Sequence, residues 1–389
     1  MALRLIRLDE SHRPAFEALL AHSWRQNWPP ELARALIRWR YYDRPLGGGT
    51  WLACNDGQCV AMFDSFVRPY LLDGRRILIR EGCDWYCLPK YRPVGLGMRL
   101  LRESMARPEP GLSISGADAT RAILPRLGWT KLPNVQSSFL PIRARGLAGA
   151  VLRNRWPAGE IYARAIPGFI PLRLPRRALT PPFGVNRVVE WRPGTPALLP
   201  IPQQQGLVGL LDQAHLDWIA RMPPALAQPL GLSFLLDDSP VAFSLSQIEP
   251  AVTGSEGRMV HLQVAHPAQA VVDWVVAETA SRLAARGVGM IRCWASTPQK
   301  LAALRKTGFA IKGPLPSYWL SKSGISTPSA LDAGFLSADN SMPFPALRGR
   351  YLARPWAAPN RSRSSTGFGK GSVDGPASSA GRGKRLREA

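Results

Sequence analysis

The feature that most constrains the fold is a faint internal repeat at an offset of about 180 residues. Trp39, followed by Pro45, matches Trp218, followed by Pro223. Three further matches follow in the same order: Gly57 with the segment 238–240, residues 126–129 with 306–309, and Phe139 with Trp319. Four matches in one order at a nearly constant offset indicate a duplicated domain.

Both copies follow one order of predicted elements. The Asp56-Gly57 turn joins two strands, and Leu96, Leu100, Leu101 and Met105 form one apolar helical stripe. In the first copy we expect strands at 3–8, 50–55, 58–68, 76–88, 112–115 and 136–142, and helices at 12–25, 30–41, 95–106 and 119–127. In the second we expect strands at 187–192, 231–237, 240–248, 259–265, 290–294 and 316–321, and helices at 268–286 and 298–306. This order predicts an α/β class, with a mostly antiparallel mixed sheet flanked by helices in each copy.

Composition divides the chain further. The predicted domains are 1–142 and 187–325, joined by an Arg- and Pro-rich linker at 143–186, which we expect to be a plain connector because its prolines disfavour a long helix. A C-terminal extension at 326–354 precedes a basic tail at 355–389, which is poor in large apolar residues and is expected to be disordered.

The formal charge of +23 suggests nucleic-acid binding, but its distribution disfavours it. Residues 143–192 hold ten Arg against two Glu, and residues 354–389 hold eight basic residues against two acidic ones. Most of the charge therefore falls on the linker and the tail, and the domains are only mildly basic. The sequence has no apolar run long enough for a transmembrane segment, and its first residues lack the apolar core of a signal peptide, so a cytoplasmic location is expected.

The five cysteines have no CxxC spacing. Cys54 and Cys59 flank a hairpin turn and are expected to face each other across two strands, while Cys83 and Cys87 share one face of a third strand. A zinc site would need all four to converge from extended strands, which is unusual for structural zinc. We therefore expect buried apolar thiols and no metal site.

A candidate anion site lies where a predicted strand ends and a helix begins. Leu88 ends the strand, and Arg92, two residues, Gly95, Leu96 and Gly97 follow. Helix N-termini carry unpaired N–H groups and a partial positive charge, and glycine lets the backbone approach a ligand closely. The pattern alone is weak, but its position between a strand and an amphipathic helix supports it.

This segment resembles the pyrophosphate loop of the GNAT superfamily of acyl-CoA N-acyltransferases, and 119–129 resembles the superfamily's next helix, which closes on a Gly-aromatic pair. The resemblance covers about 1–142 and, more weakly, 187–321; within the superfamily it is loosely similar to members encoded with bacterial polysaccharide genes. It implies acetyl-CoA or another acyl-CoA as co-substrate. Backbone N–H groups from Val94 to Gly97 would hold the pyrophosphate, with Arg92 nearby, and donors near Leu88 would polarise the thioester. Pro93 has no N–H and removes one donor.

Two carboxylates precede the loop. The resemblance places the catalytic base on this strand, which makes Glu81 and Asp84 the candidates, although they point to opposite faces and at most one fits. No tyrosine occurs from 119 to 128 to serve as the acid. In the second copy the positions of Arg92, Gly95 and Gly97 are taken by Val272, Val275 and Ala277, so this copy is expected to be a non-catalytic partner.

The leading hypothesis is an N-acyltransferase that moves an acetyl or acyl group from acyl-CoA to a primary amine of a small molecule or amino sugar. One alternative is an enzyme similar to the tandem-domain aminoacyl-tRNA-dependent ligases, which would need no acyl-CoA. Another is a non-catalytic protein that binds a partner or nucleic acid. The sequence names neither the acceptor nor the oligomeric state.

Overall fold

The computed structural model describes residues 3–24, 29–47, 49–155, 159–168, 170–172, 185–202, 204–251 and 253–332. The described residues form one unit by their contacts. The predicted basic tail, most of the C-terminal extension and residues 173–184 of the linker lie outside the described residues.

The first half contains the strands and helices that its sequence predicts. They are β1 (Leu3–Arg7), α1 (Arg13–Trp24), α2 (Pro30–Ile37), β2 (Trp51–Asn55), β3 (Gln58–Leu72), β4 (Arg75–Cys87), α3 (Leu96–Met105), β5 (Gly111–Ile114), α4 (Asp118–Ile123) and β6 (Thr130–Pro141). Short helical turns lie at Glu10–His12, Pro89–Tyr91 and Leu124–Leu127, and α2 continues as a π-helix over Arg38–Tyr42.

The second half repeats this order, except that a short strand and one helix stand in place of α1 and α2 and a short strand is added at the end. It contains β7 (Val185–Trp191), β8 (Leu207–Gly209), α6 (Gln213–Ala220), β9 (Gln228–Leu236), β10 (Ser239–Ala251), β11 (Gly254–Val264), α7 (Gln269–Ala285), β12 (Met290–Ala295), α8 (Pro298–Thr307), β13 (Ala310–Leu320) and β14 (Leu331–Asp332). The predicted α/β class and the duplication are therefore confirmed.

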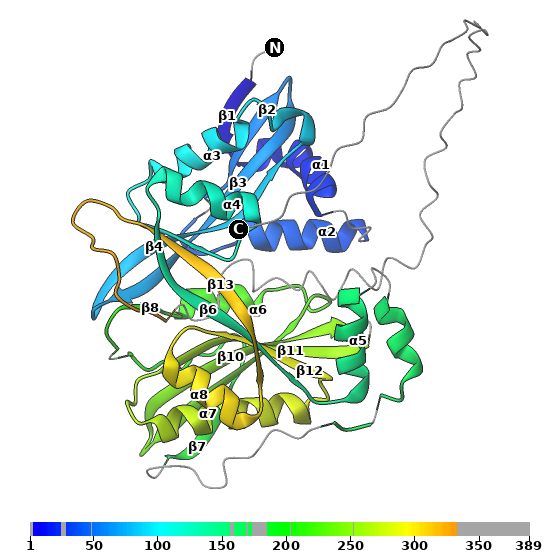
Figure 1. Cartoon of the computed structure of the whole chain (residues 1–389), viewed down its shortest axis with the longest axis vertical. Coiled ribbons are helices and arrows are strands. Elements are labelled where there is room, and N and C mark those ends of the chain that lie inside the picture. The colour runs from blue at the N-terminus through cyan, green and yellow to red at the C-terminus, as the bar shows by residue number, and fades with distance from the viewer. Residues whose placement is uncertain are drawn as a thin grey trace, which may run out of the picture. The chain divides into compact units, whose positions relative to one another are not determined.

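One continuous sheet joins the two halves because they exchange their last long strands. The strand order is β1-β2-β3-β4-β5-β13-β6-β12-β11-β10-β9-β7. Thus β13 of the second half pairs with β5 of the first, and β6 of the first half pairs with β12 of the second. Figure 1 shows β6 and β13 crossing side by side between the halves, where they also pair with each other.

The matched tryptophans of the repeat meet at the interface between the halves. The rings of Trp39 and Trp218 stack with centroids 4.4 Å apart and planes 4° apart. Trp39 Nε1 donates to the Trp218 carbonyl at 2.7 Å, and Trp218 Nε1 donates to the Trp39 carbonyl at 2.8 Å. Each tryptophan donates a hydrogen bond to the backbone carbonyl of the other. The pair is therefore related by a local twofold axis, as a duplicated domain predicts.

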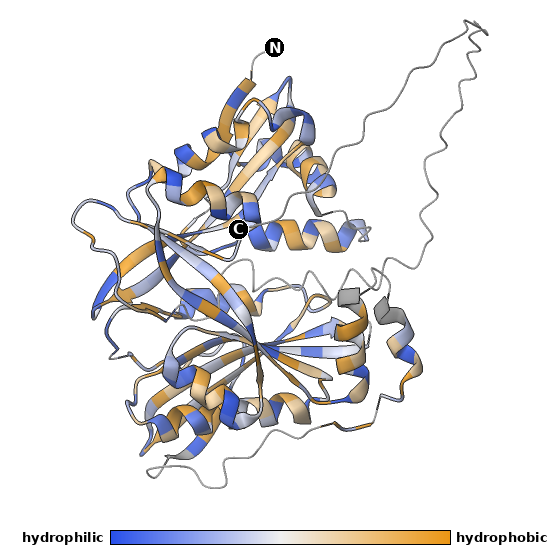
Figure 2. Cartoon of the chain, in the orientation of Figure 1, coloured by the Kyte–Doolittle hydropathy of each residue, from blue (hydrophilic) through white to orange (hydrophobic). Residues whose placement is uncertain are grey.

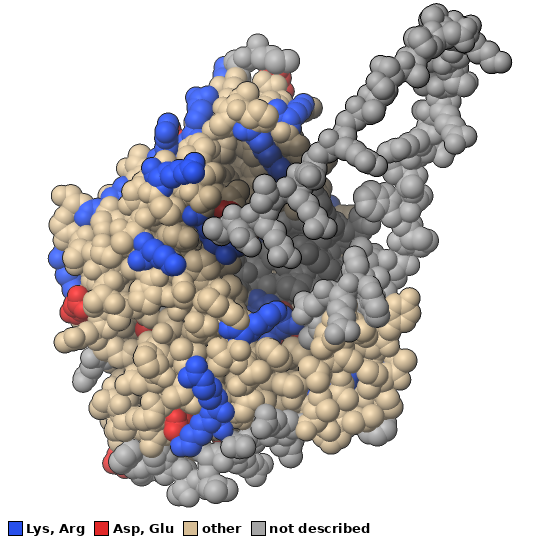
Figure 3. All heavy atoms as spheres, in the orientation of Figure 1, with Lys and Arg blue, Asp and Glu red and all other residues tan. Residues whose placement is uncertain are grey.

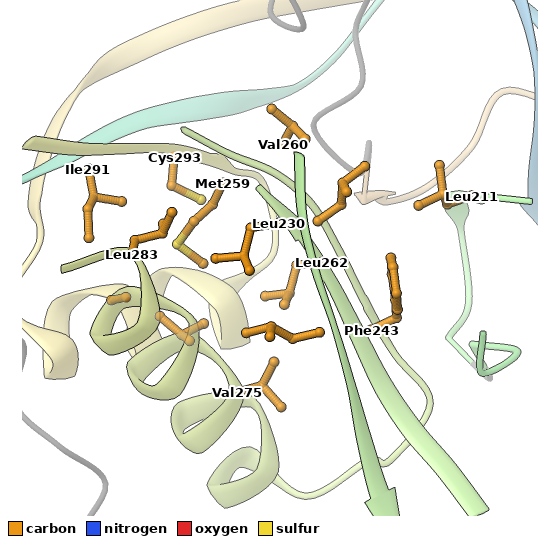
Figure 4. Close-up of a cluster of buried hydrophobic side chains, with 14 of the residues drawn as sticks. Leu211, Leu230, Phe243, Met259, Val260, Leu262, Val275, Leu283, Ile291 and Cys293 are labelled. Carbon is orange, nitrogen blue, oxygen red and sulfur yellow. The ribbon is translucent and has the colours of Figure 1, made fainter. Parts of the chain in front are cut away.

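The largest hydrophobic core belongs to the second half. Figure 4 shows Val275 and Leu283 of α7 packed against Phe243, Met259 and Leu262 of the strands. The first half has smaller clusters, one of which lies under α3. Figure 2 shows that most helices in both halves mix apolar and polar residues, as expected of elements that cover a sheet on one side.

One local expectation is corrected. The segment 143–186 is more than a connector, because Ala144–Arg155 forms the helix α5. Its sequence contains no proline, and Gly146 packs so closely on the Gly289 backbone that a Cβ there would lie 2.3 Å from the Gly289 carbonyl oxygen. Asp118 is the first residue of α4 and forms an ion pair with Arg121. Among the described helices, none has the length and apolar character to cross a membrane.

Candidate functional site

The site predicted from the sequence lies at a gap between two parallel strands. β4 and β5 pair only at Arg80 with Gly111 and at Glu81 with Leu112. Beyond this point β4 continues to Cys87, while β5 remains paired with β13 on its other side. A cavity of about 270 Å³ lies at the gap. Its lining residues are Phe63, Gly82, Cys83, Asp84, Trp85, Leu101, Ser113, Ile114, Gly116, Ala117, Thr120, Leu124 and Trp129.

A β-bulge on β4 lies beside this gap. Phe63 faces Trp85 and Ser65 faces Gly82, so Asp64 of β3 stands opposite two residues of β4, Cys83 and Asp84. The Leu88 N–H donates to the Val60 carbonyl of β3 at 3.0 Å. Because backbone groups alternate in direction along a strand, the N–H groups of Cys87 and Trp85 face away from β3, toward the gap. The Leu88 N–H therefore bonds to β3, and the N–H of the preceding residue, Cys87, is the donor that faces the gap.

The predicted loop forms a tight turn that leads into α3. Gly95 has a φ of +70° and open space where a side chain would lie. Its N–H donates to the Arg92 carbonyl at 3.1 Å, and the Arg92 side chain turns back so that its Nε donates to the Cys87 carbonyl at 3.0 Å. Arg92 thus links the loop to the end of β4.

Several N–H groups at the start of α3 remain available for a ligand. Arg99 N–H begins the helical bonding by donating to the Gly95 carbonyl at 3.2 Å. Within the part of the chain that the structure describes, the N–H groups of Val94, Leu96 and Gly97 have no acceptor. Val94 is 67% exposed, so the turn is open to solvent. Free donors at the N-terminus of a ten-residue helix are the arrangement that binding of an anion requires.

The two glycines of the motif have different roles. Gly95 supplies the left-handed backbone of the turn, which a side chain disfavours. Gly97 supplies space for the Trp85 ring, since a Cβ at Gly97 would lie 2.7 Å from Trp85 Nε1. Gly97 therefore sets how closely α3 packs on β4, and Trp85 closes one side of the cavity.

Of the two candidate carboxylates, only Asp84 lines the cavity. Glu81 is 2% exposed and forms an ion pair with Arg68 at 3.1 Å, and it also accepts a hydrogen bond from the Tyr70 hydroxyl. Burial, followed by the nearby Glu81 charge, raises the pKa of Tyr70 well above its usual value. Glu81 thus belongs to a buried network that reaches the second half. In this network Arg68 Nη2 also donates to the Leu210 carbonyl at 3.4 Å.

Asp84 is held by two residues, Arg40 and Tyr41, for which the sequence predicted no role. Arg40 donates to Asp84 Oδ2 from Nε at 3.0 Å and from Nη2 at 2.5 Å, and the Tyr41 hydroxyl donates to the same oxygen at 2.7 Å. Burial, followed by the Asp84 charge, raises the pKa of Tyr41 well above its usual value, so Tyr41 remains a donor. Arg40 and Tyr41 come from the π-helix after α2, a geometry that is often found at functional sites.

The cysteines of the first half do not converge on one point. Cys54 and Cys59 lie together, whereas Cys83 Sγ donates to Asp64 Oδ2 at 3.1 Å and Cys87 Sγ contacts the Leu88 carbonyl at 3.6 Å. Burial, followed by the Asp64 charge, raises the pKa of the Cys83 thiol well above its usual value. Among the described residues, no cluster of three His, Cys, Asp or Glu side chains is placed to hold a metal ion.

A buried lysine lies in the second half at the position of a residue that lines the cavity in the first half. Lys300 occupies the position that matches Thr120, a residue lining the cavity of the first half. Its ammonium group donates to the Leu262 carbonyl of β11 at 2.5 Å and pairs with Asp332 at 2.8 Å. The predicted substitutes Val272, Val275 and Ala277 are all buried, and they lie within α7, which begins at Gln269, rather than in a loop before it. At the position of Thr120 the second half therefore carries a buried, ion-paired lysine where the first half has a residue that lines the cavity.

Comparisons with solved structures returned proteins of related architecture at very low identity. A GCN5-related N-acetyltransferase from Anabaena variabilis has 10% identity and a TM-score of 0.49 over 82% of this chain and 72% of that chain. The Saccharomyces cerevisiae N-myristoyltransferase with bound myristoyl-CoA has 11% identity and a TM-score of 0.49 over 85% and 87%. A tandem GNAT protein from the clavulanic acid biosynthesis pathway has 11% identity and a TM-score of 0.47 over 84% and 100%.

No protein-family model matches the sequence, and no curated protein does. Because all three TM-scores are below 0.5, we base the functional proposal on the residues of this chain.

Proposed function

We propose that this protein is a tandem GNAT-like acyl-CoA N-acyltransferase whose first half, near residues 1–142, binds acyl-CoA. The second half, near residues 187–325, is a degenerate copy. The observation that carries the proposal is the coincidence of two features: a gap between β4 and β5, and free N–H groups at the N-terminus of α3 beside it. Neither feature is needed for a packed sheet, and together they match a co-substrate with a pyrophosphate and an extended amide arm.

Each part of acyl-CoA has a counterpart in the first half. The pyrophosphate binds the N–H groups of Val94, Leu96 and Gly97, aided by the positive end of the α3 dipole. The pantetheine arm lies along the free edge of β4, where it pairs as an additional strand with backbone groups of Trp85 and Cys87. The thioester then reaches the bulge at Cys83 and Asp84.

The acceptor amine attacks the thioester carbon directly. The carbonyl oxygen gains negative charge, which the N–H groups that face the gap stabilise. The bond to sulfur breaks, coenzyme A leaves as its thiol, and the amine loses one proton. We assign Asp84 to the amine, which it orients and whose proton it accepts, because it lines the cavity while Glu81 does not. Arg40 and Tyr41 fix the Asp84 carboxylate in position. We propose a small-molecule amine or amino sugar as the acceptor.

Figure 3 bears on the nucleic-acid alternative. On the face in view, the Lys and Arg side chains of the described residues are scattered and form no continuous stripe. A protein that grips nucleic acid through its phosphates concentrates such residues along one surface. This face of the described residues therefore gives the nucleic-acid alternative no support.

Two measurements test the proposed function. Calorimetry with the full-length chain and acetyl-CoA measures binding directly, and release of free coenzyme A thiol in the presence of a panel of primary amines measures transfer. The proposal expects binding together with amine-dependent release of thiol. Absence of any affinity for acetyl-CoA or longer acyl-CoA would reject it and leave the tRNA-dependent or non-catalytic alternatives.

A further inference from the structure

Cys54 and Cys59 form a close pair across the hairpin of β2 and β3. The two-residue turn consists of Asp56 and Gly57, with φ values of +48° and +79°. Asn55 and Gln58 form the first pair of the ladder, and Cys54 lies directly opposite Cys59 in the next one. Their sulfur atoms are 3.0 Å apart. A disulfide needs a separation of about 2.05 Å, so a movement of about 1 Å joins them.

The two thiols are buried in an apolar cluster, away from the cavity at the gap. Cys54 is 8% exposed and Cys59 is 5% exposed, and they belong to an apolar cluster with Phe16 and Leu20 of α1 and with Met62. Neither cysteine lines the cavity at the gap. Two thiols in direct register are more than packing requires, because a single small apolar residue on either strand would fill this space.

We propose that Cys54 and Cys59 are a reversible dithiol–disulfide site. The oxidant is a low-molecular-weight disulfide. One cysteine thiolate attacks a sulfur of this disulfide, forms a mixed disulfide and releases the first small thiol. The second cysteine then attacks the mixed disulfide, forms the Cys54–Cys59 bond and releases the second small thiol. Two protein S–H bonds are lost, one S–S bond forms, and the small disulfide is reduced to two thiols.

The hydrogen bond between the two sulfur atoms holds one beside the other for these steps. Either sulfur can be its donor, so either cysteine can attack first while the other closes the bond. Because both sulfurs lie under α1, the rate is limited by opening of the hairpin or of the helix, and oxidation is slow.

The pair lies next to the segment that ends at the proposed site. Val60, the residue after Cys59, accepts the Leu88 N–H at the end of β4. Asn55 Nδ2 lies 3.5 Å from the Tyr91 hydroxyl, and Leu88 packs against the same cluster as the cysteines. A disulfide at this point stiffens the hairpin that supports the loop before α3.

The test uses the full-length wild-type chain in buffers of reduced and oxidised glutathione, incubated overnight and then acid-quenched. Alkylation with N-ethylmaleimide in denaturant counts free thiols by intact mass. The fully reduced chain, with five cysteines, takes five adducts. The proposal expects three adducts under oxidising conditions, and two peptides joined by a disulfide after cleavage before Asp56. Reduction with dithiothreitol should restore all five. The closed loop is short, so the disulfide should raise Tm by up to about 3 °C.

Matched variants assign the site. Cys59→Ser should form no disulfide within the chain and should lose at most one thiol, as a glutathione mixed disulfide on Cys54, whereas Cys293→Ser, at a cysteine of the second half, should still lose two thiols to a disulfide within the chain. Five adducts on the folded wild-type chain at every glutathione ratio would overturn the proposal, as would a disulfide that joins any other cysteines. Peptide mapping of the wild-type chain gives the answer even where a variant does not fold.

Discussion

A valine at Gly95 tests whether the turn before α3 holds the pyrophosphate. Gly95 has a φ of +70°, where a side chain costs about 1–2 kcal/mol. The turn relieves this strain by moving toward ordinary backbone angles, and the N–H groups of Val94, Leu96 and Gly97 then lose their common direction. A hydrogen bond to a charged group contributes about 1.5–3 kcal/mol. Loss of one such bond raises the Kd for acetyl-CoA about 10- to 150-fold, and loss of two raises it further.

Gly74 provides the matched control. It lies in the turn between β3 and β4, has a φ of +82°, and like Gly95 has open space at the position of a Cβ. Gly74→Val therefore carries a similar backbone strain at a distance from the loop. Calorimetry with acetyl-CoA should show a large loss of affinity in Gly95→Val and wild-type affinity in Gly74→Val, while both melt at similarly lowered temperatures. Equal affinity in the two variants would refute the assignment of the turn.

Three further predictions concern ionisable groups. Asp84→Asn keeps the contacts with Arg40 in part but removes the base, so kcat should fall about 100-fold with little change in acyl-CoA affinity; an unchanged kcat would exclude Asp84 from proton transfer. Glu81→Gln leaves the buried Arg68 without its counter-charge, and urea denaturation should show a loss of about 3–5 kcal/mol; a loss below 1 kcal/mol would contradict the buried ion pair. Burial lowers the pKa of His261 to about 3, so the unfolded chain takes up a proton near its ordinary value of 6.5 and the folded chain does not. Stability should therefore fall as pH drops from about 6.5 toward 3, and His261→Gln should flatten this dependence; an identical pH profile in the variant would show that the histidine is not responsible.

Much of the fold could be predicted from the sequence because the two halves repeat one pattern. Trp39 and Trp218 were matched by spacing alone, and the structure stacks them against each other. The exchange of β6 and β13 could not be predicted, because a strand has the same alternating pattern whichever neighbour it pairs with. Helix α5 was missed because the prolines after residue 155 dominated the composition of the whole segment.

The site was predictable where it depends on local backbone geometry. Gly95 and the start of α3 lie together in sequence, so the pattern of glycines located the free N–H groups. The roles of the carboxylates depend on contacts between distant segments. Asp84 bonds to Arg40, 44 residues earlier in the chain, and Glu81 bonds to Arg68 on the neighbouring strand. Sequence spacing predicts neither contact. Trp85 and Gly97 are likewise joined only by the packing of α3 on β4.

Amide hydrogen exchange with and without coenzyme A tests most directly whether the first half binds the co-substrate in the gap between β4 and β5. The account predicts slower exchange at Val94, Leu96 and Gly97 and at the β4 amides of Trp85 and Cys87, with no change at the start of α7, residues 268–272, in the second half. Unchanged exchange across residues 85–98 at saturating coenzyme A, or protection confined to the second half, would contradict it.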